Sequence, residues 1–111
     1  MKKAGKYIMV FVTCAHYNEA NEIAHALVKD KLVACVNILL HSESLFWWQK
    51  KIDRASEIVI IAKTTAAKMQ NLVVRVKKMH SYKVPEIIAL PIIDGSAEYL
   101  DWIDDSVKEK E

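Results

Sequence analysis

Apolar positions along the chain change their spacing several times, and each change marks a predicted element. Residues 6–14 are rich in β-branched and aromatic side chains, which is typical of a β-strand. Asn18 is a suitable N-cap for a helix with acidic residues in its first turn. The apolar residues after it recur at helical spacing and predict a buried stripe of Ala20, Ile23, Ala24, Leu27 and Val28.

The middle of the chain carries a long apolar stretch that predicts a β-hairpin. Residues 32–48 form one extended segment, residues 49–53 its turn and residues 56–63 the returning strand. Residues 32–40 and 58–62 within these segments are apolar at odd and at even positions, so neither stretch offers a regular polar face to water. We therefore expect both faces of this hairpin to need cover.

A helix, a strand and a last helix complete the pattern. Thr64 or Thr65 would cap the helix, whose predicted buried stripe is Met69, Leu72, Val73, Val76 and Met79. Residues 84–93 predict the strand. Gly95 and Ser96 open the last helix, which is predicted to carry on one side Tyr99, Ile103 and Val107.

The order β-α-β-β-α-β with a terminal helix predicts a single α+β domain over residues 1–111. Two βαβ-like halves with right-handed crossovers give a ferredoxin-like sandwich, an antiparallel sheet with its helices on a single face. The other face would expose more apolar surface than a monomer tolerates. We expect copies of the same chain to cover it, with the 32–63 hairpin extending a neighbour's sheet; the alternative is an unrelated partner protein.

Composition and charge exclude several classes of protein. The 111 residues include 16 Lys and Arg against 14 Asp and Glu, and this small excess argues against a nucleic-acid binder. Two cysteines make no disulfide framework. The apolar run 7–15 follows lysines as in a signal peptide, but it is short and lacks a small-x-small cleavage site. No run approaches the ~20 apolar residues of a membrane span, so we expect a cytoplasmic protein without membrane contact.

Residues 80–86, His-Ser-Tyr-Lys-Val-Pro-Glu, place an imidazole, a phenol and a carboxylate between a helix and a strand. Pro85 forces Val84 out of helical geometry, so the chain must turn here. His80 and Glu86 could coordinate a cation or transfer protons. The structural alternative is a histidine on the helix dipole and a loop carboxylate bonded to the backbone.

Other reactive side chains also have structural interpretations. Cys14 and His16 offer donors that suit Cu or Zn, but two ligands do not close a site. Cys35 lies in an apolar run and is predicted to belong to the core. Glu57 and Lys63 share one strand face, where we expect an ion pair between subunits. Because the sequence shows no glycine-rich phosphate loop and no nucleophile–base pair, we predict no catalytic residues and no enzyme.

Five stretches, in order along the chain, resemble motifs of the CutA divalent-ion tolerance family. They are residues 31–37 (family pattern KLAACVN), residues 44–48 with Glu57 (S-x-Y-x-W … E), Lys63 with Thr64 (KT), residues 80–87 (HPYEVPEI) and residues 99–103 (YLxWI). The resemblance implies a homotrimer similar to PII signalling proteins. It also implies a link to tolerance of copper or other divalent cations, with a site in the clefts between subunits.

The chain departs from the family pattern at informative positions. Phe46 stands at a usual tyrosine and removes a hydroxyl. Lys50 stands at a usual glycine, so we expect the hairpin turn to lack its positive-φ residue or to shift register. Val12 and Met79 occupy the places of a cysteine and a histidine invoked for copper in some relatives, which makes copper binding through those positions doubtful.

The favoured hypothesis is a homotrimeric metal-tolerance protein that responds to metal ions and binds Cu(II) or another divalent cation weakly near the intersubunit clefts. It needs no organic cofactor, and its predicted ligands are His80 and Glu86. The residues expected to line the cleft are Tyr82, Lys63, Glu57, Trp48 and Cys35. Two alternatives stay open: a PII-like sensor of a small anionic metabolite, and a ligand-free trimer that acts as a scaffold for other proteins.

Overall fold

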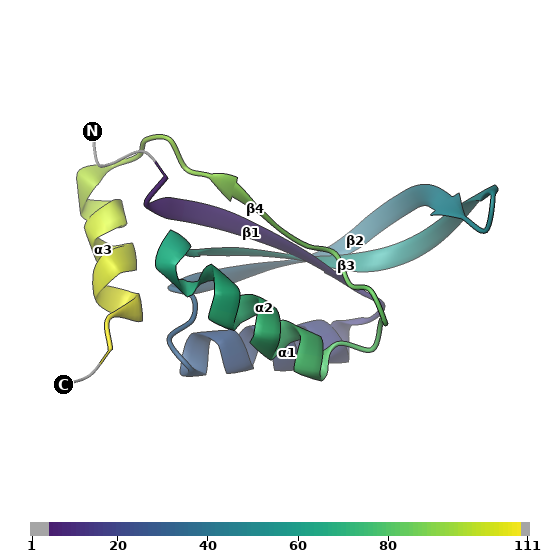
Figure 1. Ribbon diagram of the computed structural model, residues 1–111, viewed down its shortest axis with the longest axis horizontal. Coiled ribbons are helices and arrows are strands. Elements are labelled where there is room, and N and C mark those ends of the chain that lie inside the picture. Colours follow the sequence, from purple (N-terminus) through teal and green to yellow (C-terminus); the bar gives the residue numbers. More distant parts are fainter. Residues whose placement is uncertain (1–4, 110–111) are drawn as a thin grey trace.

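Four strands form one antiparallel sheet in the computed structural model, which describes residues 5–109 (Figure 1). The elements are β1 (Tyr7–Cys14), α1 (Tyr17–Lys29), β2 (Cys35–Trp48), β3 (Lys51–Thr65), the 3-10 helix η1 (Ala66–Lys68), α2 (Met69–Met79), β4 (Ile87–Pro91) and α3 (Ala97–Val107). The strand order is β2-β3-β1-β4, with every neighbouring pair antiparallel. The predicted α+β ferredoxin-like arrangement is therefore confirmed.

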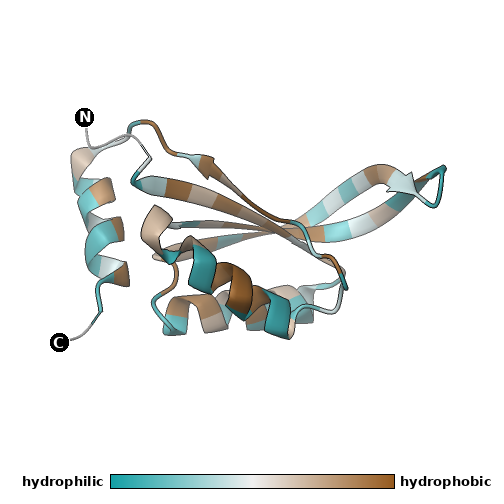
Figure 2. Ribbon diagram, in the orientation of Figure 1, coloured by the Kyte–Doolittle hydropathy of each residue, from teal (hydrophilic) through white to brown (hydrophobic). Residues whose placement is uncertain are grey.

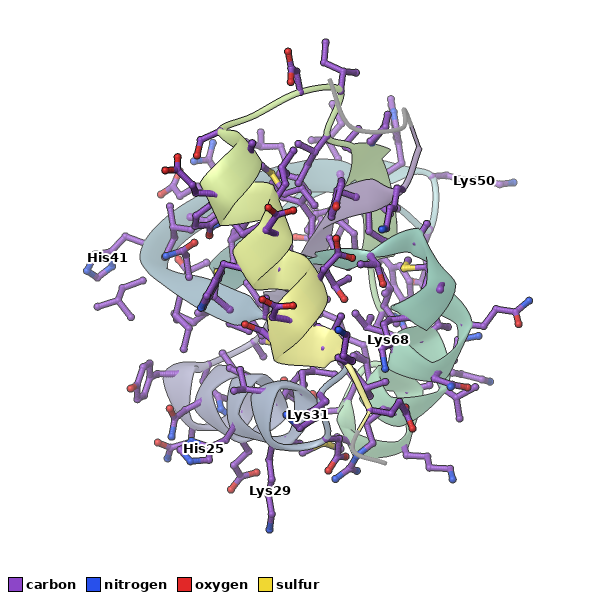
Figure 3. All side chains as sticks on the ribbon, turned by 90° about the vertical axis from the view of Figure 1, so that its left-hand side faces the viewer. His25, Lys29, Lys31, His41, Lys50 and Lys68 are labelled. Atoms are coloured by element: carbon purple, nitrogen blue, oxygen red, sulfur yellow. The ribbon has the colours of Figure 1, made fainter. Side chains whose placement is uncertain are left out.

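The hairpin between β2 and β3 is longer and tighter than the sequence pattern indicates. Its turn is only Gln49 and Lys50, since Trp48 already pairs with Lys51, whereas the predicted turn covered residues 49–53. Both turn residues have positive φ, 50° and 67°. The expectation that the turn lacks its positive-φ residue is therefore wrong, because non-glycine residues adopt the two-residue hairpin geometry here. The alternative of a shifted register stays a prediction. Lys50 points away from the body of the protein (Figure 3).

Helix ends and faces differ from the prediction at single residues. α1 begins at Tyr17 with His16 at the N-cap, so Asn18 lies inside the first turn. Val28 lies outside the buried stripe of α1. The predicted start of the last helix is confirmed, because Ser96 is the N-cap of α3 and its Oγ accepts a hydrogen bond from the Tyr99 amide at 3.2 Å. The Tyr99 side chain is exposed, and the buried residues of this helix are Leu100, Ile103 and Val107.

The main core lies between the sheet and two helices. α1 and α2 run along one face of the sheet, and their apolar stripes meet the even-numbered residues of β1 (Figures 1 and 2). The fully buried members of this core include Val10, Val12, Cys14, Ile23, Leu27, Leu72 and Val76. This packing puts the carboxyl end of β1 next to the first turn of α1 and the end of α2.

The opposite face of the sheet is apolar and only partly covered. α3 covers one end of it, where Tyr7 packs against Leu100 and Ile103. Farther along this face Ile88 and Leu90 of β4 are about half exposed, at 51% and 50%. The β2–β3 hairpin projects beyond the body and exposes several large apolar residues: Leu45, Trp47, Trp48 and Ile52 (Figures 1 and 2). The expectation that all helices lie on a single face is therefore wrong for α3, because its apolar residues cover one end of this face, while the rest of the face and the hairpin are exposed in a single chain.

Candidate functional site

A groove of about 730 Å³ lies where the hairpin leaves the body of the protein. Its apolar walls include Leu45, Phe46 and Trp48 of β2 and Val84 of the loop before β4. Three carboxylates also line it: Asp53, Glu57 and Glu86. Of the side chains predicted to surround a ligand, the structure therefore brings four to one place: Trp48, Glu57, Tyr82 and Glu86.

Tyr82 and Glu57 form the best-defined contact of this groove. The Tyr82 hydroxyl donates a hydrogen bond to Glu57 Oε2 at 2.8 Å, and the Glu57 side chain is buried. Burial and this hydrogen bond to an anion raise the pKa of Tyr82 to about 12. Tyr82 therefore stays protonated near neutral pH and holds one oxygen of the Glu57 carboxylate.

His80 lies behind Tyr82 rather than among the residues that line the groove. It is the C-cap of α2 and is buried. Its Nε2 donates to the Thr13 carbonyl oxygen at 2.7 Å, because a carbonyl only accepts, and its Nδ1 accepts from the Tyr82 amide at 3.0 Å. The predicted ligands are thus placed differently, with Glu86 on the groove and His80 inside the subunit. Their coordination of one cation stays a prediction.

Lys63 and Cys35 lie elsewhere, directly opposite each other on β3 and β2. Lys63 Nζ donates to Asn37 Oδ1, and Cys35 Sγ lies 3.5 Å from the Tyr99 hydroxyl. The contact with Cys35, together with burial, raises the pKa of Tyr99 to about 12. Neither residue lines the groove, and an ion pair between Lys63 and Glu57 of different subunits stays a prediction.

A second cluster of polar side chains lies inside the subunit. Ligand-type atoms of Cys14, Glu19 and His80 all lie within 4.8 Å of one another, and all three residues are buried. His16, which the sequence suggested as a partner of Cys14, is exposed instead. Sequence reasoning missed Glu19 as a site residue. The available signal was its helical spacing of four from Ile23, which puts this carboxylate on the buried side of α1.

Burial and hydrogen bonds act in opposite directions on the ionisable groups of this cluster. Burial, with the nearby carboxylates of Glu19 and Glu57, raises the pKa of the Cys14 thiol to about 12. For Glu19, burial works against ionisation, but hydrogen bonds from Ser81 and the interaction with His80 outweigh it and lower its pKa. Among the described residues, Glu19 Oε2 accepts from the Ser81 amide at 2.6 Å, whereas Oε1 is buried without a hydrogen bond of normal geometry.

Comparison with known proteins identifies the family. The sequence model described as "CutA1 divalent ion tolerance protein" matches residues 8–106. The "Divalent-cation tolerance protein CutA" of Archaeoglobus fulgidus is 44% identical over 99 residues, which is 89% of this chain and 96% of that protein. The chain belongs to the CutA1 divalent ion tolerance family.

Solved structures of the CutA1 family agree with the fold. The structure titled "Periplasmic divalent cation tolerance protein CutA" from A. fulgidus superposes with a TM-score of 0.89 at 43% identity, covering 92% of this chain and 99% of that one. "Protein CutA 1, chloroplastic" of Oryza sativa subsp. japonica is 39% identical over 92% of this chain, which spans only 58% of that relative's length. These names place CutA1 relatives in different compartments. They describe the family by tolerance to cations rather than by an enzymatic reaction.

Three of the positions where this CutA1 chain departs from its family lie in the core or the groove, and Lys50 lies in the hairpin turn. Val12 is fully buried, and Met79 packs against the same core. Val12 precedes Cys14 by two residues on β1, and Met79 directly precedes His80 at the end of α2. Phe46 lines the groove with its ring and brings no hydroxyl to it.

None of the helices within residues 5–109 has the length and apolar character that a membrane-spanning helix needs.

Proposed function

We propose that this protein is a homotrimeric divalent-cation tolerance protein that binds Cu(II) or another divalent cation weakly in the groove beside the hairpin. The observation that carries the proposal is the set of three carboxylates, Asp53, Glu57 and Glu86, on one partly apolar groove. Carboxylate oxygens are ligands for divalent cations, and apolar walls strengthen their attraction by excluding water. The names of the CutA1 relatives support a role with divalent cations. The proposal itself includes no catalysis and no organic cofactor.

The homotrimer in this proposal is supported by the surface that one chain leaves bare. Burying a large apolar side chain contributes about 1.5–3 kcal/mol, and the hairpin and open sheet face together offer several. Leu45 and Trp48 belong both to this surface and to the groove wall. A neighbouring copy that covers them would therefore turn the groove into a cleft between subunits.

A cytoplasmic location is part of the same proposal. All but the last residue of the stretch 7–15, which resembles the apolar part of a signal peptide, belongs to β1, and β1 lies between β3 and β4 in the sheet. Its side chains Val10, Val12 and Cys14 are fully buried, so this segment serves the fold. Fractionation of cells that express the tagged chain tests the location.

Calorimetric titration of Cu(II) into the protein tests the groove site. The Glu86→Ala variant should bind at least about tenfold more weakly, because it loses a charged ligand. The Glu22→Ala variant, which removes an exposed carboxylate of α1, is the matched control and should bind as the wild type does. No heat of binding, or identical isotherms for wild type and Glu86→Ala, would contradict the groove site. An unchanged isotherm for His80→Ala would remove this histidine from the pair.

A small anionic metabolite is a less favourable ligand for the groove as one subunit forms it. The lining residues include three carboxylates and no lysine or arginine. Like charges disfavour binding of an anion at such close range. A thermal shift with a metabolite in the absence of metal would support the PII-like alternative. A stoichiometric partner protein whose binding does not depend on metal would support the scaffold.

A further inference from the structure

The cluster of Cys14, Glu19 and His80 has the composition and the compactness of a metal site. One donor atom from each residue (a sulfur, a carboxylate oxygen and a ring nitrogen) lies within 4.8 Å of the other two. The three residues come from the end of β1, the first turn of α1 and the C-cap of α2. We propose that this cluster binds one transition-metal cation of the zinc class inside each subunit, with these three side chains as ligands.

The carboxylate supplies the first argument for a cation. Glu19 Oε1 is buried without a hydrogen bond of normal geometry among residues 5–109, while Oε2 is held by the Ser81 amide at 2.6 Å and the Ala15 backbone N–H also helps to lower the pKa of the carboxyl. An unsatisfied polar atom in the interior is costly to stability and is rare in folded proteins. A cation bonded to Oε1 satisfies this oxygen and neutralises its charge.

The histidine is held as metal-binding histidines usually are. Its Nε2 donates to the Thr13 carbonyl oxygen at 2.7 Å, which fixes the ring and leaves the lone pair on Nδ1. That lone pair accepts from the Tyr82 amide at 3.0 Å. Binding through Nδ1 therefore exchanges one amide hydrogen bond for a metal bond. Tyr82 lies in a loop outside helices and strands, so losing this bond breaks no hydrogen bond of a helix or a sheet.

The donor set and its spacing select the class of cation. Thiolate and imidazole favour Zn and Cu, whereas Mg and Ca prefer sites built only of oxygen. Around a tetrahedral Zn²⁺ with bonds of 2.0–2.3 Å, neighbouring ligand atoms lie about 3.3–3.8 Å apart. The cluster needs to contract by only about 1 Å to reach this geometry. Three protein ligands leave the fourth position for water or another ligand.

The same three residue types also occur in cysteine hydrolases, but the surroundings of Cys14 argue against that chemistry. A nucleophilic cysteine needs exposure and a lowered pKa. Cys14 is fully buried, and burial raises its pKa. A metal ion can reach the cluster more easily than a substrate can, because the neighbouring residues Ala15, His16 and Ser81 are exposed. The ion then displaces the thiol proton, which leaves to solvent.

This inference rests on the proposed cation-binding function and adds a site distinct from the groove. The groove uses Glu86 and lies beside the hairpin, whereas the cluster uses Cys14 and lies on the helix side of the sheet. A substitution of Glu86 therefore tests cation binding in the groove, and a substitution of Cys14 tests cation binding in the inner cluster.

Titration of the reduced, metal-free full-length protein with Co²⁺, the spectroscopic substitute for Zn²⁺, tests the inner site. We expect a thiolate-to-cobalt charge-transfer band that saturates at one Co²⁺ per subunit and disappears on addition of Zn²⁺. Cys14→Ser should lose this band, and the matched control Cys35→Ser should keep it. Glu19→Gln preserves side-chain shape and should weaken Co²⁺ binding by at least about tenfold.

Several results would overturn the inner site. They are the absence of the band in the wild type, its loss in Cys35→Ser with retention in Cys14→Ser, or wild-type Co²⁺ affinity in Glu19→Gln. The Glu19→Gln variant decides the question if Cys14→Ser does not fold, as judged by circular dichroism. Glu86→Ala should keep the band. If the band is absent while Cu(II) binding still depends on Glu86, the inner site fails and the proposed groove function stands.

Discussion

Tyr82 connects the two candidate sites. Its side-chain hydroxyl donates a hydrogen bond to Glu57 Oε2 on the groove, and its backbone amide donates one to Nδ1 of His80 in the interior. The rings of Tyr82 and His80 also lie in contact, with centroids 4.8 Å apart. A change at Tyr82 therefore reaches the groove through Glu57 and the inner cluster through His80.

Tyr82→Phe should lower the free energy of unfolding by about 1.5–3 kcal/mol, because a buried carboxylate loses its hydrogen-bond donor. Chemical denaturation at fixed protein concentration measures this loss. Tyr99→Phe is the matched control, since its hydroxyl has only a long 3.5 Å contact to Cys35 and should contribute less. Equal effects of the two substitutions would show that the Glu57 contact is unimportant for stability.

The same tyrosine predicts a dependence of stability on alkaline pH. Its pKa is raised to about 12 in the folded protein, chiefly by burial and then by Glu57. A raised pKa means that its contribution is complete below the unfolded pKa of about 10 and is lost as the pH rises through about 12. Denaturation between pH 9 and pH 12 should therefore show a smaller loss of stability in Tyr82→Phe than in wild type. An identical pH profile would contradict this assignment.

At the scale of elements, the β2–β3 hairpin is held by its pairing and not by favourable turn residues. Twelve cross-strand pairs, from Cys35↔Lys63 to Trp48↔Lys51, align the two strands across an irregularity between Leu39 and Ser42. Its two turn residues, Gln49 and Lys50, both have positive φ, a conformation that suits Asn and Gly better. The long β2–β3 pairing thus holds Gln49 and Lys50 in a strained backbone conformation.

Replacing the turn with Gln49→Asn and Lys50→Gly should stabilise the hairpin by about 1 kcal/mol, since it relieves the left-handed strain of non-glycine residues. Thermal unfolding and amide hydrogen exchange of β2 and β3 measure the gain. Lys83→Gly is a control for the loss of one exposed lysine, and it should bring no stabilisation. A less stable double variant would contradict the strain at the turn.

At the scale of the whole molecule, the chain has an elongated shape because its hairpin extends from a compact body. The principal extents are 46 × 27 × 23 Å. The hairpin and the open sheet face carry exposed apolar residues, with Trp47 at 74% and Ile52 at 66%. A protein at equilibrium in water should cover such a surface, and the proposed homotrimer covers the sheet face and the hairpin together.

Sedimentation at micromolar concentration should show a trimer of the wild-type chain. Leu90→Glu puts a charge on the open sheet face and should shift the protein toward monomer, because burying an unpaired charge opposes association. Val74→Glu changes an equally exposed apolar residue on α2, outside the open sheet face, and should leave the trimer intact. A stable, well-folded wild-type monomer would contradict the proposed assembly.

The sequence by itself determined the order of the elements, their periods, the long hairpin and the apolar character of both sheet faces. These features depend on local spacing: Ile23 and Leu27 lie four apart on a helix, and the strands are rich in β-branched residues. It also brought Glu57, Tyr82 and Glu86 into one hypothesis through the family motifs. In the structure these three residues line one groove of the subunit, while their role toward a ligand stays a prediction.

Only the tertiary structure decided which distant side chains meet. Glu19, His80 and Cys14 share no local pattern, and they come together because α1 and α2 pack side by side on the end of β1. The two-residue turn likewise follows from strand register, which is set by pairing along the whole ladder. Periodicity reports which face of an element is buried, whereas the contacts across a core depend on how whole elements cross.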